Sequence, residues 1–168
     1  MTETFLATND FELRSTMKRG FTIFLQVVIG LLGVGVFAFL LWEPHLEGRN
    51  VNATLFQIYF KDPFLAYIYL AFVPFFVGLT RAFKILGFAR RNEIFSQRSV
   101  RALRIIKYCA LTTAIFILGA EAYLFIFMRG KDDIAGGVMM GLFIIFVSAI
   151  IATAAAVFER ILQNAVEI

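Results

Sequence analysis

Glu121 is the residue of this chain whose type and position most directly suggest chemistry. It stands in the segment LGAEAYLF, within one of the most apolar stretches of the sequence. An ionised carboxylate is costly at such depth, so it must face the bundle interior or water, or carry a proton. One interpretation is a site that binds a proton or a cation. The other is a structural carboxylate that lies one or two turns from the membrane surface and is solvated by water or a loop.

Two further residues can contribute to a polar site around Glu121. Counting depth along the neighbouring segments places Tyr69 at its level, and His45 can reach down from an outer loop. We predict that the Tyr69 hydroxyl or a backbone group satisfies the carboxylate, which makes Glu121, Tyr69 and His45 a candidate intramembrane polar site. The apolar segments otherwise offer uncharged polar groups such as Gln26, which weakens the hypothesis of a proton relay across the membrane.

The rest of the chain shows no catalytic constellation. It holds one histidine and one cysteine, and it has neither a phosphate-binding loop nor the HExxH zinc motif. Asp132 and Asp133 are adjacent carboxylates without further ligands, and acids at that place favour the start of the following helix. We therefore expect no enzymatic activity, no cofactor and no metal site.

Four long apolar segments must position these residues. Hydrophobic residues make up 60% of the 168 positions and the mean hydropathy is +0.81, whereas a soluble domain is about 45–50% apolar. A helix of about 20 apolar residues crosses a hydrocarbon core of about 30 Å. The pattern predicts one all-α domain over residues 1–168, an integral membrane four-helix bundle whose last helix continues to residue 167. The expected spans lie at about 21–42, 63–83, 106–128 and 134–158.

Local signals refine the second and third helices. Pro63 suits the first turn of a helix, and Pro74 predicts a kink that frees the carbonyl four residues before it. Ser96 is a good N-cap, and Phe95 before it is placed like a staple residue. An amphipathic helix should therefore follow Ser96 and lead into the third span.

The distribution of basic residues orients the bundle. Twelve of the 16 lysines and arginines lie on the side that holds both termini and the loop 81–107. The other four lie in the loops 43–62 and 129–133. Because cytoplasmic loops carry the excess of basic residues, we expect a multi-pass protein of the cytoplasmic (inner) membrane. Both termini and the amphipathic loop helix should face the cytoplasm (N-in/C-in).

The loop 81–107 presents a basic surface. Two interpretations stay open: the charges serve topology and attract anionic lipid, or they hold a cytoplasmic protein partner. Direct binding of nucleic acid fits poorly, because no fold signature accompanies the charge. The candidate partner or lipid face comprises Arg90, Arg91, Arg98, Arg101, Arg104 and Lys107.

Small residues share one face of the fourth span. Gly137, Gly141, Ser148 and Ala152 follow one another at steps of four, seven and four residues. Such a face lets two helices approach closely. It can pack inside the bundle, or it can form a homodimer.

Three stretches resemble a family of small bacterial four-span membrane proteins known only as a domain of unknown function (DUF). They are FKILGFARRNEIFSQRSVRALRIIKYCALT, DDIAGGVMMGLFIIFVSAII and AAAVFERILQNAVEI. The resemblance implies a bacterial protein with the topology above, often encoded beside a small Cro/repressor-like helix-turn-helix regulator, and it implies no activity or cofactor. The chain departs from the family pattern at Glu121, where uncharged residues are usual, and after Ile168, where members continue with a short polar tail.

These observations favour a non-enzymatic regulatory or sensory membrane protein that acts through its basic cytoplasmic face. Its expected partners are the lipid bilayer and a small helix-turn-helix regulator. One alternative is a small transporter or channel subunit with a proton or cation site at Glu121. Another is a structural subunit of a membrane complex.

Overall fold

The chain folds into long helices, as a computed structural model shows. It describes residues 2–46, 63–91, 93–128 and 135–167. Side chains are described in these ranges except at 2–19, 43–46 and 128. The described residues contain no strand, which confirms the all-α prediction. The elements are α1 (Thr2–Leu46), α3 (Pro63–Arg90), α4 (Gln97–Tyr123), the π-helical segment η2 (Leu124–Met128) and α5 (Ala135–Glu167).

Each helix carries a stretch that is long and apolar enough to cross a membrane. The mean hydropathy of these stretches lies between 1.8 and 2.6. Most of their large apolar side chains are exposed, which suits contact with lipid tails rather than with water. The stretches lie within Gly20–Trp42, Pro63–Arg90, Gln97–Phe127 and Ala135–Glu167.

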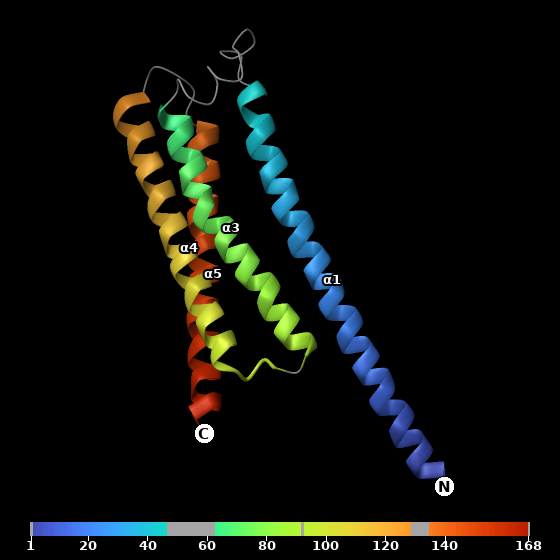
Figure 1. Ribbon diagram of the computed structural model, residues 1–168. Coiled ribbons are helices and arrows are strands. Elements are labelled where there is room, and N and C mark those ends of the chain that lie inside the picture. Colours follow the sequence, from blue (N-terminus) through green and yellow to red (C-terminus); the bar gives the residue numbers. More distant parts are fainter. Residues whose placement is uncertain (1, 47–62, 92, 129–134, 168) are drawn as a thin grey trace.

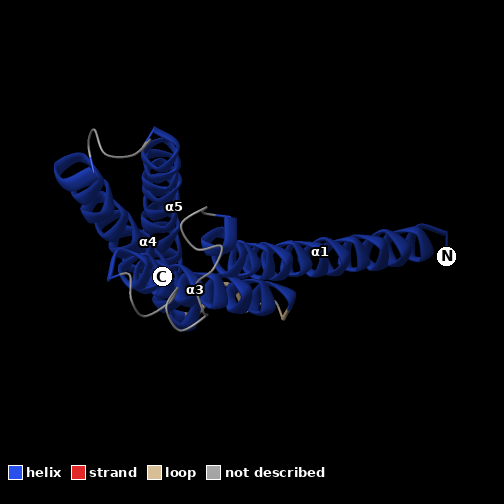
Figure 2. Ribbon diagram, turned by 90° about the horizontal axis from the view of Figure 1, so that it is seen from above, coloured by secondary structure: helices blue, strands red, loops and turns tan. Residues whose placement is uncertain are grey.

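The helices pack in the order α5, α4, α3, α1. The main contacts join α4 to α5, α3 to α4, and α1 to α3 (Figure 1). Seen from above, α3, α4 and α5 group together and α1 extends away from them (Figure 2). The first turns of α1, the last turns of α5 and the connection between α3 and α4 lie at one end of the molecule. We call this end the basic end, because it holds the arginines of residues 90–101.

The ends of α3 and α4 form where local residue types predict. Helix α3 begins at Pro63 and stays helical through Pro74 to Arg90. Ser96 is the N-cap of α4: its backbone is extended, and its Oγ accepts a hydrogen bond from the Ser99 N–H at 3.4 Å. The Ser99 hydroxyl is fully buried and donates to the Glu93 carbonyl at 3.5 Å, which ties the connection to the start of α4.

Glycines and tyrosines set how closely α3 approaches its neighbours. A Cβ at Gly33 of α1 would lie 2.7 Å from Leu79 Cδ2 of α3, so a side chain there would require the end of Leu79 to move. On the other side of α3, the Tyr67 hydroxyl donates to the Phe116 carbonyl of α4 at 2.9 Å. A Cβ at Gly119 would lie 2.5 Å from this hydroxyl oxygen. Small residues therefore hold both contacts of α3, as expected where helices associate in lipid.

Candidate functional site

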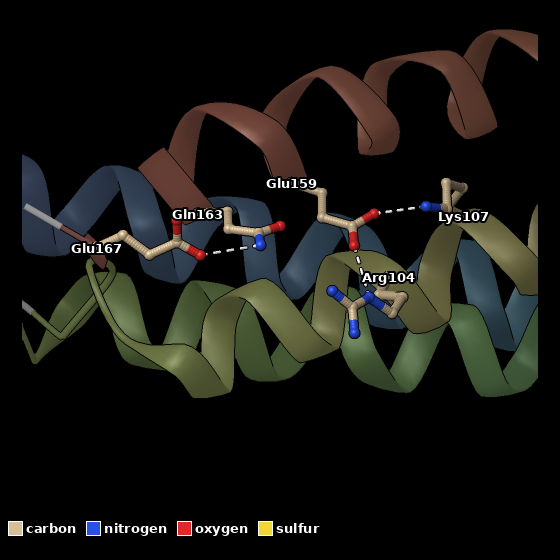
Figure 3. A network of polar contacts seen from close by, with 5 residues as sticks. All are labelled: Arg104, Lys107, Glu159, Gln163 and Glu167. Carbon is tan, nitrogen blue, oxygen red and sulfur yellow. Dashed lines mark hydrogen bonds and ion pairs between the residues drawn. The ribbon is translucent and has the colours of Figure 1, made fainter. Parts of the chain in front are cut away.

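A buried acid of α5 pairs with two cations of α4 at the basic end. Glu159 is 6% exposed. Its Oε1 accepts from Arg104 Nε and its Oε2 accepts from Lys107 Nζ, both at 2.6 Å (Figure 3). Arg104 and Lys107 lie three residues apart on one face of α4, so a single carboxylate reaches both. This cluster fixes α4 against α5 near the basic end.

The Glu159 cluster separates the six basic residues of the predicted partner or lipid face into two that form ion pairs and four that do not. Arg104 and Lys107 neutralise Glu159, and Lys107 also lies 4.9 Å from the centre of the Tyr108 ring. These two side chains are therefore engaged within the protein, although the Arg104 side chain is 48% exposed. The other four are exposed, and within the described ranges they have no ion-pair partner. They are Arg90, Arg91, Arg98 and Arg101.

The free arginines surround the connection between α3 and α4. Arg90 ends α3, where a cation suits the helix macrodipole. Arg98 lies in the first turn of α4, where a cation opposes the macrodipole and no acid is present. Helix stability therefore does not account for Arg98. Glu167, an acid on the last turn of α5, accepts a hydrogen bond from Gln163 at 3.0 Å rather than pairing with one of these arginines (Figure 3).

Glu121 lies deep between α4 and α5. It is 6% exposed, and its Oε2 has no hydrogen-bond partner among the described residues. Its side chain occupies the space beside Gly141 of α5, since a Cβ at Gly141 would lie 1.6 Å from Glu121 Oε1. The π-helical segment begins three residues later at Leu124, whose N–H bonds to the carbonyls of both Ala120 and Glu121. π-helical segments often mark functional positions in helices.

The Tyr69 hydroxyl donates elsewhere, so the Tyr69 alternative of the prediction for Glu121 is wrong. The Tyr69 hydroxyl donates to the Leu40 carbonyl of α1. Two residues advance a helix by about 200°, so Tyr67 faces α4 while Tyr69 faces α1. Tyr67 and Tyr69 lie at nearly the same depth in the membrane. Depth alone therefore does not reveal which neighbouring helix a residue faces. The side chain of His45 lies outside the described part of the structure.

The small residues of α5 lie mostly on its buried face. Gly141, Ser148 and Ala152 are buried, whereas Gly137 is exposed, and a Cβ added there would make only ordinary contact with Leu124. The structure thus packs this face inside the bundle.

Glu159 and Thr113 are buried polar groups that the sequence did not predict. Glu159 continues the small-residue face of α5, because the steps from Gly141 through Ser148 and Ala152 to Glu159 are seven, four and seven residues. That spacing indicates that Glu159 lies on the same buried face of α5 as these small residues. Thr113 of α4 is 4% exposed and its hydroxyl has no partner in the described part of the chain; threonine is common in membrane helices, so its type carried no signal. The described residues hold no cluster of three potential metal ligands.

Comparison with known proteins agrees with this architecture. The profile of a family described as "Protein of unknown function (DUF2975)" matches residues 50–168. The chain is similar to the "Uncharacterized membrane protein YoaS" of Bacillus subtilis (strain 168), with 39% identity over 155 residues, which cover 90% of this chain and 95% of the relative. No solved structure matches the chain significantly.

Proposed function

The chain belongs to the DUF2975 family of membrane proteins, and on that premise we propose that it is a non-enzymatic regulatory or sensory protein acting through its basic end. The observation that carries this proposal is the set of free guanidinium groups around the connection between α3 and α4. Four exposed arginines, for which the described residues provide no acidic partner, stand on a frame that the Glu159 cluster holds together. No enzymatic family is indicated by the comparisons.

The partner that suits this surface is a soluble protein with an acidic face. Guanidinium groups bind carboxylates through two parallel hydrogen bonds, which gives direction as well as attraction. The excess of basic residues at this end favours its placement in the cytoplasm. A small helix-turn-helix regulator encoded beside the gene, which the family resemblance suggests, is the partner to test first.

Co-purification in mild detergent tests this proposal. We expect the neighbouring regulator to elute with the wild-type protein and to be lost from the double variant Arg98→Glu/Arg101→Glu. The control is Arg160→Glu, which makes the same kind of substitution at one exposed arginine of α5, with half the charge change of the double variant, and should retain the partner. Equal capture by all three proteins, or no capture by the wild type, would refute the proposal.

The orientation has its own test. A phosphatase fused after Ile168 should stay inactive in intact bacteria, because that enzyme works only outside the cytoplasm. A fluorescent protein fused at the same position should fold and emit. The opposite pair of results would place the basic end outside and remove the proposed partner.

A proton or cation site is the second candidate function, because Glu121 is buried and its Oε2 finds no hydrogen-bond partner in the described ranges. Intramembrane acids commonly mark ion pathways. Proton or sodium flux into liposomes should then fall in Glu121→Gln and persist in Glu93→Gln, which changes an exposed acid of the connection between α3 and α4. Equal flux in protein-free liposomes and in liposomes with the wild type would exclude this function.

A further inference from the structure

An open groove runs between α1 and α3. Its volume is about 510 Å³, within the range of roughly 300–1,000 Å³ that is common for sites of small ligands. Each helix contributes five residues to its lining. They include Gly30 and Gly33 of α1, and Leu79, Thr80 and Lys84 of α3.

Two glycines of α1 have different roles in the groove. Gly33 allows the close contact with Leu79, where a Cβ would lie 2.7 Å from Cδ2. Nothing lies within 4 Å of a Cβ built on Gly30, so the space beside Gly30 is empty. The two helices therefore touch at Gly33 and leave a gap at Gly30.

The groove is apolar except at one end. Thr80 and Lys84 are its only polar lining residues, and they lie one turn apart on the same face of α3. Both are exposed, and Lys84 has no ion-pair partner in the described part of the chain. Since α3 runs toward Arg90, this polar end of the groove is the one nearer the basic end.

We propose that this groove binds one anionic phospholipid of the leaflet at the basic end. An acyl chain lies along the apolar lining, and the phosphate meets the Lys84 ammonium, while the Thr80 hydroxyl donates to the Val77 carbonyl of its own helix at 2.8 Å. Lysine is a common ligand of phosphate, and basic pockets between membrane helices bind anionic headgroups. A membrane helix of another protein fits less well, because it would cover Lys84 with apolar surface and leave the ammonium unpaired.

Native mass spectrometry of the full chain in detergent tests the headgroup preference. We expect added phosphatidylglycerol to bind more tightly than phosphatidylcholine of the same chain length. Lys84→Gln should weaken phosphatidylglycerol binding about fivefold and leave phosphatidylcholine unchanged, as loss of one basic residue near a phosphate predicts. Equal binding of the two lipids by the wild type, or equal loss of both in Lys84→Gln, would overturn the proposal.

Filling the groove tests the site of the acyl chain. Gly30→Leu should abolish lipid retention, because its side chain enters the empty space beside α3. Gly35→Leu is the matched control: a Cβ there also meets nothing within 4 Å, but residue 35 does not line the groove. Lipid retention by Gly30→Leu at the level of Gly35→Leu would refute the site. If Gly30→Leu does not fold, as judged by circular dichroism and a single elution peak, Gly30→Val repeats the test, and the Lys84→Gln result stands independently.

Discussion

Replacing Gly141 by alanine is the sharpest test of how α4 packs on α5. The new Cβ would lie 1.6 Å from Oε1, 2.7 Å from Cδ and 3.3 Å from Cγ of Glu121. Three successive atoms are too close, so a turn of the terminal carboxylate alone does not relieve the clash. Glu121 is 6% exposed and has little free space to move into. The substitution must therefore displace α5 or force the Glu121 side chain out of its place.

The magnitude follows from two opposing terms. Overpacking of a well-packed site costs about 1–3 kcal/mol, and replacing glycine by alanine within a helix returns about 0.5–1 kcal/mol. We expect a net loss of about 1 kcal/mol in the free energy of unfolding. The measurement is reversible unfolding in mixed micelles with increasing dodecyl sulfate, followed by circular dichroism.

Two further variants separate this clash from other effects of the mutation. Gly136→Ala is the control, because a Cβ there meets nothing within 4 Å, and its stability should be unchanged or slightly higher. Glu121→Ala in the Gly141→Ala background should remove the clash, so the double variant should be more stable than the sum of the single changes by about 1 kcal/mol. Strict additivity, or equal stability of Gly141→Ala and Gly136→Ala, would refute the packing described for Glu121.

Three other substitutions test separate contacts. Ser96→Ala should lower the free energy of unfolding by about 1 kcal/mol through loss of the α4 cap, whereas Ser96→Asp should retain it; equal loss in both would contradict the cap. Lys107→Met and Glu159→Gln should be non-additive by about 1 kcal/mol in a double-mutant cycle in detergent, as for side chains that share an ion pair, and an additive cycle would show that the pair does not form. Gly33→Val should separate α1 from α3 by its clash with Leu79, which cysteine crosslinking across the two helices would detect as a lower yield; an unchanged yield would argue against the close contact.

Helix positions were readable from the amino-acid order because they depend on local chemistry. Each apolar segment is long enough to cross a bilayer, and the backbone of such a segment can satisfy its hydrogen bonds in lipid only as a helix. The cap at Ser96 and the start at Pro63 follow from the same residues that predict them. The clustering of arginines near the connection between α3 and α4 is likewise a property of the chain order.

Packing between segments that are distant in sequence decides which side of each helix faces which neighbour. Tyr67 and Tyr69 have the same type and nearly the same depth, yet one binds α4 and the other α1. Glu159 pairs with residues 55 and 52 positions away, so the sequence around it could not show that Arg104 and Lys107 are occupied. Rotation of a helix about its axis changes these partners without changing its hydropathy, because lipid accepts any apolar face equally. The close approaches at Gly33, Gly119 and Gly141 therefore form only when the four helices pack together. The same packing creates the buried site of Glu121.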